Sequence, residues 1–84
     1  EEVTLRAYGS FADYLRKHPF HHSQVERNDM GTFTSFDYML LVTDELVDEI
    51  LALGDKVEIT FPEKLRMKLL QKIGRIRNRY DVSF

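Results

Sequence analysis

Five cations recur along the last part of the chain at a spacing that matches one face of an α-helix. Steps of four, four, three and four residues separate them, and such steps keep side chains on one stripe of a helix. An aligned cationic stripe can contact phosphates and release counterions from nucleic acid. It can equally be the solvated side of a helix that docks on protein. The five cations are Lys64, Lys68, Lys72, Arg75 and Arg79.

Apolar residues follow these cations one position later, which predicts a helix with one continuous apolar face that packs on the rest of the fold. No aromatic side chains alternate with the cations to stack on bases, and no segment like Arg-Gly-Phe-Gly-Phe marks the third predicted strand. We therefore favour a solvated or protein-docking stripe, with direct nucleic-acid contact as the alternative. The apolar residues are Leu65, Leu69, Ile73, Ile76 and Tyr80.

Charge is unevenly divided along the chain. The first 60 residues hold five Lys and Arg against twelve Asp and Glu, whereas the remainder holds seven against two. Such asymmetry indicates a polar partner, or one part of the fold docking on another. Four acidic residues of the second predicted helix form a solvated face that can also meet the basic helix of a neighbour. They are Asp44, Glu45, Asp48 and Glu49.

Three histidines cluster in the segment HPFHHSQ, at His18, His21 and His22. A metal site needs converging ligands, and adjacent residues of a strand point to opposite faces, so we do not expect His21 and His22 to share an ion. Ser23 with a histidine and either Asp13 or Asp37 has the composition of a hydrolytic set, but nothing in the pattern positions a nucleophile or oxyanion donors.

Other chemistry finds little support in the sequence. Tyr8, Phe33 and Phe36 can line a ligand groove, although aromatic residues at strand spacing more often belong to a core. An acylphosphatase-like site would need a phosphate-binding loop with an arginine after the first strand, and the segment YGSF offers none. We predict no enzyme activity, no catalytic residues, no metal and no cofactor.

Periodicity and turn residues predict seven elements in the order strand, helix, strand, strand, helix, strand, helix. Ser10 with Asp13 resembles a capping box, Thr43 can cap the second helix, and Gly54 suits its left-handed end. This order predicts an α+β fold, a ferredoxin-like βαββαβ sandwich with an additional C-terminal α-helix. The elements are expected near residues 3–8, 11–18, 24–27, 32–42, 44–53, 56–61 and from 62 onward.

The inward residues follow from the same patterns. They are Val3, Leu5 and Ala7; Phe36, Tyr38, Leu40 and Val42; Leu46, Val47, Ile50, Leu51 and Leu53; and Val57, Ile59 and Phe61.

Composition limits the class of protein. Eighty-four residues without low-complexity segments suit one domain, residues 1–84. The absence of cysteine excludes disulfides and thiolate metal sites and fits a reducing cytosol. No membrane-spanning run or signal-peptide pattern occurs, so we expect a cytoplasmic protein without membrane contact. Because Glu1 opens the sequence without an initiator Met, we interpret the chain as part of a longer or processed protein.

The segments SQVE, DELVDEILALGDKVEITFPEKLR and RNRY resemble the C-terminal extension domain of bacterial WYL-domain transcriptional regulators. Relatives share a Pro-x-His-x-Ser-Gln segment, a Leu- and Ile-rich helix ending in Gly, a Val-rich strand, a Pro, and a last helix that opens with Leu-Arg and closes on Tyr. Relatives often carry a Trp in the second helix, near Glu49 of this chain, which has none. The matching residues are Pro19, His21, Ser23, Gln24, Leu46, Ile50, Leu51, Gly54, Val57, Pro62, Leu65, Arg66 and Tyr80.

The resemblance implies a parent regulator with an N-terminal winged-helix DNA reader and a central WYL effector domain. It also implies homodimer and interdomain contacts made by the C-terminal domain, whereas DNA is contacted by an N-terminal domain absent from this sequence. From it we expect a non-enzymatic regulatory domain that positions the sensing and DNA-binding domains. The alternative is direct binding of single-stranded nucleic acid or a small anionic effector through the basic C-terminal helix.

Overall fold

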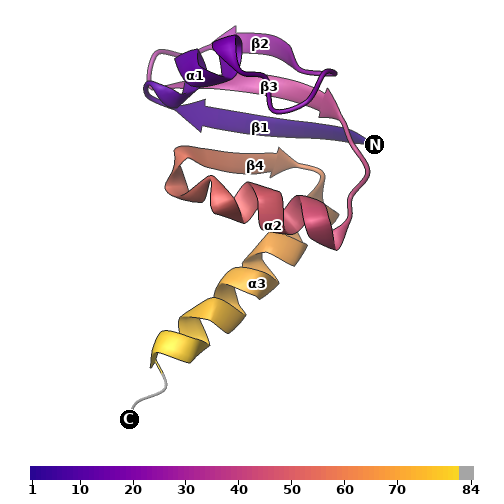
Figure 1. The fold of residues 1–84 in the computed structure, drawn as a ribbon, viewed down its shortest axis with the longest axis vertical. Coiled ribbons are helices and arrows are strands. Elements are labelled where there is room, and N and C mark those ends of the chain that lie inside the picture. Colours follow the sequence, from indigo (N-terminus) through magenta and orange to yellow (C-terminus); the bar gives the residue numbers. More distant parts are fainter. Residues whose placement is uncertain (82–84) are drawn as a thin grey trace.

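The computed structural model describes residues 1–81 and contains a four-stranded antiparallel sheet. The strands are β1 (Glu2–Tyr8), β2 (Val25–Asp29), β3 (Phe33–Met39) and β4 (Val57–Phe61). The helices are α1 (Phe11–Lys17), α2 (Asp44–Ala52) and α3 (Glu63–Asp81), and a short 3-10 turn, η1 (Gly54–Lys56), follows α2. Figure 1 shows the sheet above α2 and α3 extending away from it.

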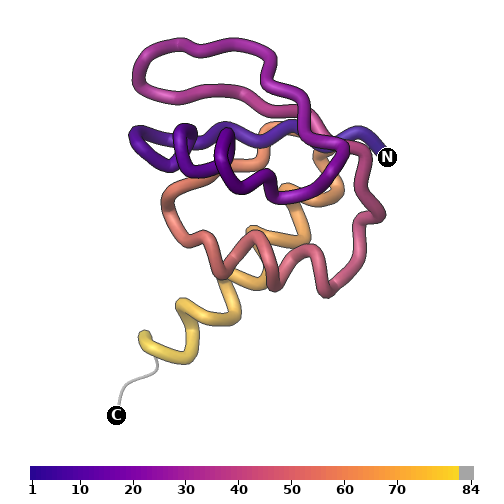
Figure 2. The backbone as a smooth tube through the Cα atoms, turned by 45° about the horizontal axis from the view of Figure 1, so that its top comes forward, coloured from indigo at the N-terminus to yellow at the C-terminus, as the bar shows by residue number. Residues whose placement is uncertain are grey.

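The strands lie in the order β2-β3-β1-β4, and each neighbouring pair is antiparallel. It follows that β1 and β2 run in the same direction on either side of β3, and that β3 and β4 do so on either side of β1. Figure 2 follows the chain from α1 through its loop into β2 at the edge of the sheet. The α+β class, the element order and the C-terminal helix predicted from sequence are therefore confirmed.

The core lies on the sheet face that α1 and α2 cover. Alternate strand residues enter it, as expected of a sheet with one wet face. Leu51, Leu40, Val42 and Val57 are only partly buried against this core. Its buried members are Val3, Leu5, Ala7, Ala12, Leu15, Phe36, Tyr38, Leu46, Val47, Ile50, Ile59, Leu65 and Leu69.

Two of the three predicted helix boundary signals are confirmed. The Thr43 hydroxyl accepts a hydrogen bond from the Leu46 amide at 3.1 Å, and Gly54 has a φ of 64° at the end of α2, a conformation that costs a side-chain-free residue little. The predicted Ser10–Asp13 capping box is wrong. Ser10 makes no side-chain cap, because its backbone is helical (φ −67°, ψ −13°) and not extended as a capping residue requires. The Asp13 carboxylate is bound by Arg16 at 2.6 Å.

The inward position predicted for Phe61 is also wrong, since its side chain is 51% exposed. The β1–β4 register shifts between Leu5 and Thr4, so that Ile59 pairs with Leu5 but Phe61 pairs with Thr4. A bulge of this kind moves the following side chain to the other face of the sheet. Phe61 thus lies on the face opposite the helices.

Arg16 connects α1 to the edge strand β2. Its guanidinium contacts Glu26 at 2.8 Å and Asp29 at 3.6 Å in addition to Asp13. The hydrogen bond from Arg16 lowers the pKa of Glu26. These contacts hold β2, whose own side chains are all exposed, against the helical layer.

Gln24 fastens the loop between α1 and β2. Its amide nitrogen donates to the Leu15 carbonyl at 2.9 Å, and its amide oxygen accepts from the Tyr38 hydroxyl at 2.6 Å and from the Phe20 amide at 3.1 Å. Tyr38 is almost fully buried, and this burial raises its pKa. One side chain therefore satisfies three polar groups from three separate parts of the chain.

None of the helices found within residues 1–81 has the length and apolar character that crossing a membrane would require.

Candidate interaction surface

The terminal helix α3 has two halves with different surroundings. Its 19 residues give a length of roughly 28 Å at 1.5 Å per residue. Leu65 is fully buried and Leu69 nearly so, and the first half contacts α2 and β4. The second half extends beyond the sheet and α2, as Figure 1 shows. Within residues 1–81, only the first half of α3 is anchored on the rest of the domain.

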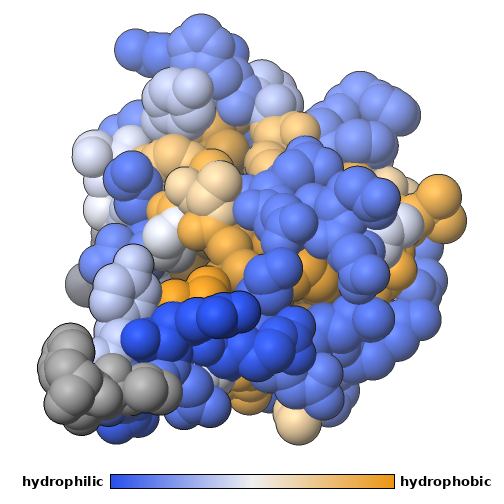
Figure 3. All heavy atoms as spheres, turned by 60° about the horizontal axis from the view of Figure 1, so that its bottom comes forward, coloured by the Kyte–Doolittle hydropathy of each residue, from blue (hydrophilic) through white to orange (hydrophobic). Residues whose placement is uncertain are grey.

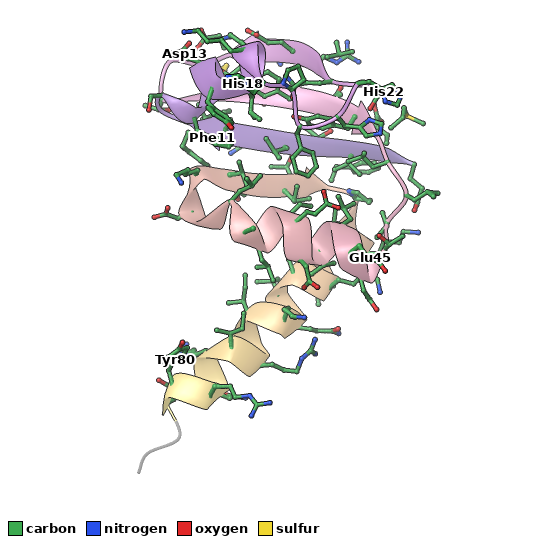
Figure 4. All side chains as sticks on the ribbon, in the orientation of Figure 1. Phe11, Asp13, His18, His22, Glu45 and Tyr80 are labelled. Atoms are coloured by element: carbon green, nitrogen blue, oxygen red, sulfur yellow. The ribbon has the colours of Figure 1, made fainter. Side chains whose placement is uncertain are left out.

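The apolar stripe of α3 divides at the same point. Ile73 is 46% exposed, Ile76 43% and Tyr80 82%, and Figure 4 shows Tyr80 at the far end of the helix. The prediction of one apolar face packed along its full length is therefore right for Leu65 and Leu69 and wrong beyond them. The physical reason is direction: α3 runs away from the sheet and α2, so no element of the described chain covers its end (Figure 1).

The basic stripe is divided as well. Lys64 lies 2.7 Å from the Glu1 carboxylate, Lys68 lies 3.8 Å from Asp44 and Lys72 lies 3.1 Å from Asp48. Arg75 and Arg79, on the projecting half, form no ion pair with any residue that the structure describes. Three of the five predicted contact residues thus hold α3 to its own chain, and two remain for other contacts.

The acidic face of α2 supplies two of these partners. Asp44 and Asp48 turn toward α3, whereas Glu45 and Glu49 form no ion pair within residues 1–81. The sequence suggested a solvated face or the basic helix of a neighbour. In the structure, Asp44 and Asp48 contact the basic helix of the same chain. The charge pattern alone does not distinguish this contact from one with a neighbouring chain.

An apolar groove of about 460 Å³ opens where α3 diverges from α2 and β4. Apolar side chains form its walls, and Arg66, Asp55 and Glu58 lie at its polar edges. Sequence analysis did not predict this groove, because the separation of α2 from α3 depends on their packing angle. Its lining residues are Ile50, Leu51, Gly54, Asp55, Val57, Glu58, Ile59, Arg66, Leu69, Leu70 and Ile73.

The histidine and serine residues do not assemble into a hydrolytic set in the described chain. Ser23 lies 2.8 Å from Nδ1 of His21 but accepts a hydrogen bond from the Met39 amide at 2.9 Å. Figure 4 shows His22 far from Asp13, and Asp37 is bound by Thr4 at 2.8 Å. Ser23 therefore connects the loop to β3.

The rings of His21 and His22 lie with centroids 4.1 Å apart. The prediction that these neighbours point to opposite faces is wrong, because they sit in a loop before β2 and do not follow strand alternation. Within residues 1–81, no three histidine or carboxylate side chains are grouped so that they could hold a metal ion.

The WCX domain family model matches residues 1–77, nearly the whole chain. The chain belongs to the WCX domain family. WCX is the C-terminal domain of WYL-domain regulators, so the resemblance deduced from sequence is confirmed. A comparison with curated proteins finds no significant match.

The sheet face opposite the helices leaves polar and aromatic side chains of the WCX chain partly exposed. Tyr8 and Phe33 lie there with ring centroids 5.8 Å apart, and the Arg6 guanidinium sits 4.4 Å from the Phe33 centroid. A hydrogen bond from Tyr8 to Glu58 raises the pKa of Tyr8. Phe36 is buried in the core on the other face, so the three aromatic residues do not line a common groove.

The pair Lys72–Asp48 gives a first test of the anchored half of α3. In a double-mutant cycle to Ala, we expect a coupling free energy of about 0.2–1 kcal/mol, because both side chains are partly exposed to solvent. Urea unfolding of the four proteins measures it. Glu49→Ala in place of Asp48→Ala is the control and should show no coupling to Lys72. Equal coupling for Asp48 and Glu49 would contradict the observed pairing.

Proposed function

We propose that this chain is the non-enzymatic C-terminal regulatory domain of a bacterial WYL-type transcriptional regulator, and that it mediates dimer and interdomain contacts. In that role it positions the effector-sensing and DNA-binding domains in the cytoplasm, while DNA is contacted by an N-terminal domain of the same protein. Family membership supports the regulatory part of the proposal. The observation that carries the contact role is the projecting half of α3, which leaves both apolar and cationic side chains uncovered.

The fold within this proposal is a single ferredoxin-like domain, residues 1–84, with α3 added. Support comes from the two interleaved strand–helix–strand units, in which β3 lies between β1 and β2 and β1 lies between β3 and β4. A small domain of this kind offers a rigid base from which a long terminal helix can reach a neighbouring domain.

Regulation then acts through the placement of α3. If effector binding favours one arrangement of the domains, contacts made by α3 in that arrangement shift the population toward it. Arg75 and Arg79 are the cations of the stripe that carry the proposed polar contact, since Lys64, Lys68 and Lys72 are engaged by carboxylates of their own chain. Salt weakens such exposed contacts by screening them.

The test is the double variant Arg75→Ala/Arg79→Ala in the intact regulator. We expect subunit or interdomain affinity to fall about 2- to 30-fold, from two exposed pairs worth about 0.2–1 kcal/mol each. Subunit exchange at low and high salt measures the effect, and high salt should reduce the difference between variant and parent. Unchanged exchange rates would overturn the contact role of these two cations.

A second candidate function rests on Arg75 and Arg79, which form no ion pair within residues 1–81. Direct binding of single-stranded nucleic acid or a small anionic effector by the basic helix would raise the fluorescence anisotropy of a labelled oligonucleotide, and the signal would fall steeply with salt. If this function holds, Arg75→Ala/Arg79→Ala should abolish the anisotropy signal. If no oligonucleotide binds the parent protein, nucleic-acid binding is excluded.

A further inference from the structure

We infer that a second copy of this chain inserts the projecting end of its α3 into the groove between α2, β4 and α3, and that each copy receives the end of the other. This inference rests on the proposed dimer contact and names its surface and its occupant. Four observations carry it: an uncovered apolar helix end, an apolar groove, their relative position, and their opposite charges.

The end of α3 and the groove are both apolar, but within one chain the end of the helix lies beyond the groove and does not fill it. Ile76 and Tyr80 lie beyond the groove, while Leu70 and Ile73 form part of its wall. Figure 3, which views the molecule from the α3 side, shows an apolar band set between strongly polar surfaces. Exposed apolar areas framed by polar residues are typical of protein interaction sites.

The positions of the helix end and of the groove along α3 allow two copies of the chain to make the same contact twice. When two copies of α3 cross antiparallel near Ile73, Tyr80 lies seven residues beyond the crossing and Arg66 seven residues before it, each roughly 10 Å away. The end of one helix therefore comes to lie beside the groove-lining part of the other, around Arg66 and Leu69. The two-fold axis applies the same contact twice, and the interface closes on itself as a dimer.

Charge favours a basic occupant for the groove. The charged side chains that line it are Asp55, Glu58 and Arg66, two anions against one cation. The projecting half of α3 carries Arg75, Arg77 and Arg79, of which Arg77 is bound by Asp81 at 3.0 Å. Complementary patches of this kind favour docking of unlike surfaces and disfavour an anionic ligand. A second copy of α3 supplies both the apolar and the cationic parts of the required partner.

The first test compares two matched substitutions in this chain. Ile73 and Met67 are both 46% exposed on α3, but only Ile73 lines the groove. Sedimentation equilibrium should show a dimer whose Kd rises at least about tenfold, or 1.4 kcal/mol, in Ile73→Glu and stays close to the parent value in Met67→Glu. Circular dichroism verifies that both variants retain the fold.

The second test uses cross-linking to determine which residues of the two copies lie next to each other. The chain has no cysteine, so single introduced cysteines are unambiguous. A short bismaleimide should join Leu51→Cys in one copy to Ile76→Cys in a copy of different mass. Leu51→Cys mixed with Asn78→Cys is the control and should yield little product, because Asn78 lies on the other side of the same helical turn.

Three results would overturn the inference. A chain that remains monomeric at all concentrations excludes self-association. A dimer with equal Kd values for Ile73→Glu and Met67→Glu excludes the groove, as does equal cross-linking of Ile76→Cys and Asn78→Cys. The proposed function fails separately, if Arg75→Ala/Arg79→Ala leaves subunit exchange of the intact regulator unchanged while the chain still forms the groove dimer.

Discussion

Replacing Leu65 with alanine is expected to lower the free energy of unfolding by about 2–5 kcal/mol. Leu65 is completely buried at the start of α3, where it packs into the core that also contains Leu69 and Ile59. Its truncation removes apolar contacts and leaves a cavity that the surrounding side chains can only partly fill. Urea unfolding of the dilute chain, where association contributes nothing, measures the difference.

Ile76→Ala is the control for this substitution. Ile76 follows Leu65 by three turns on the same stripe, yet 43% of its side chain is exposed. A change at such a surface position should stay within about 0.5 kcal/mol. If both substitutions cost the same in dilute solution, the end of α3 packs on its own chain and the projecting arrangement is wrong.

The sequence predicted the elements well where local chemistry decides them. Alternation in β1 and β3 identified Val3, Leu5, Phe36 and Tyr38 as inward residues, and all four are buried. Thr43 and Gly54 marked the two ends of α2 because a side-chain oxygen and a positive φ are local requirements. The element order then restricted the fold to an α+β sandwich.

The terminal helix shows where such prediction ends. Periodicity establishes that Leu65 and Ile76 share a face, but it does not reveal how far the body of the domain extends beneath that face. An apolar stripe that packs on its own chain and one that packs on another molecule have the same residue spacing. The contact of Lys72 with Asp48 was hidden for a related reason, since the pairing depends on how α2 and α3 cross.

Irregular backbone accounts for the remaining differences. Phe61 occupies the face opposite the helices because of a register shift that the alternation of β4 does not encode. The close, tilted rings of His21 and His22 follow from a loop conformation in which strand alternation does not apply. In both places the local backbone conformation, which the residue pattern does not reveal, sets the direction of a side chain.

Gln24→Ala is expected to cost about 2–4 kcal/mol, because it leaves three partners of one amide without a hydrogen bond and unmet buried groups cost about 1–3 kcal/mol each. Water reaches some of this partly buried site, so the total stays below the sum. The Tyr38 hydroxyl, which is buried beside it, should contribute most. Gln71→Ala, on the exposed surface of α3, is the matched control and should change stability by less than about 0.5 kcal/mol.

A cycle with Tyr38→Phe isolates that contribution. In the parent, Gln24→Ala leaves the buried Tyr38 hydroxyl without its hydrogen-bond acceptor. Tyr38→Phe has no such hydroxyl, so Gln24→Ala should cost about 1 kcal/mol less in that background than in the parent. Thermal unfolding of the four proteins gives the coupling. Strictly additive costs would mean that the Gln24–Tyr38 bond does not stabilise the fold. The loop from α1 to β2 would then be held by the bonds of Gln24 to Leu15 and Phe20 and by the bond of Ser23 to Met39.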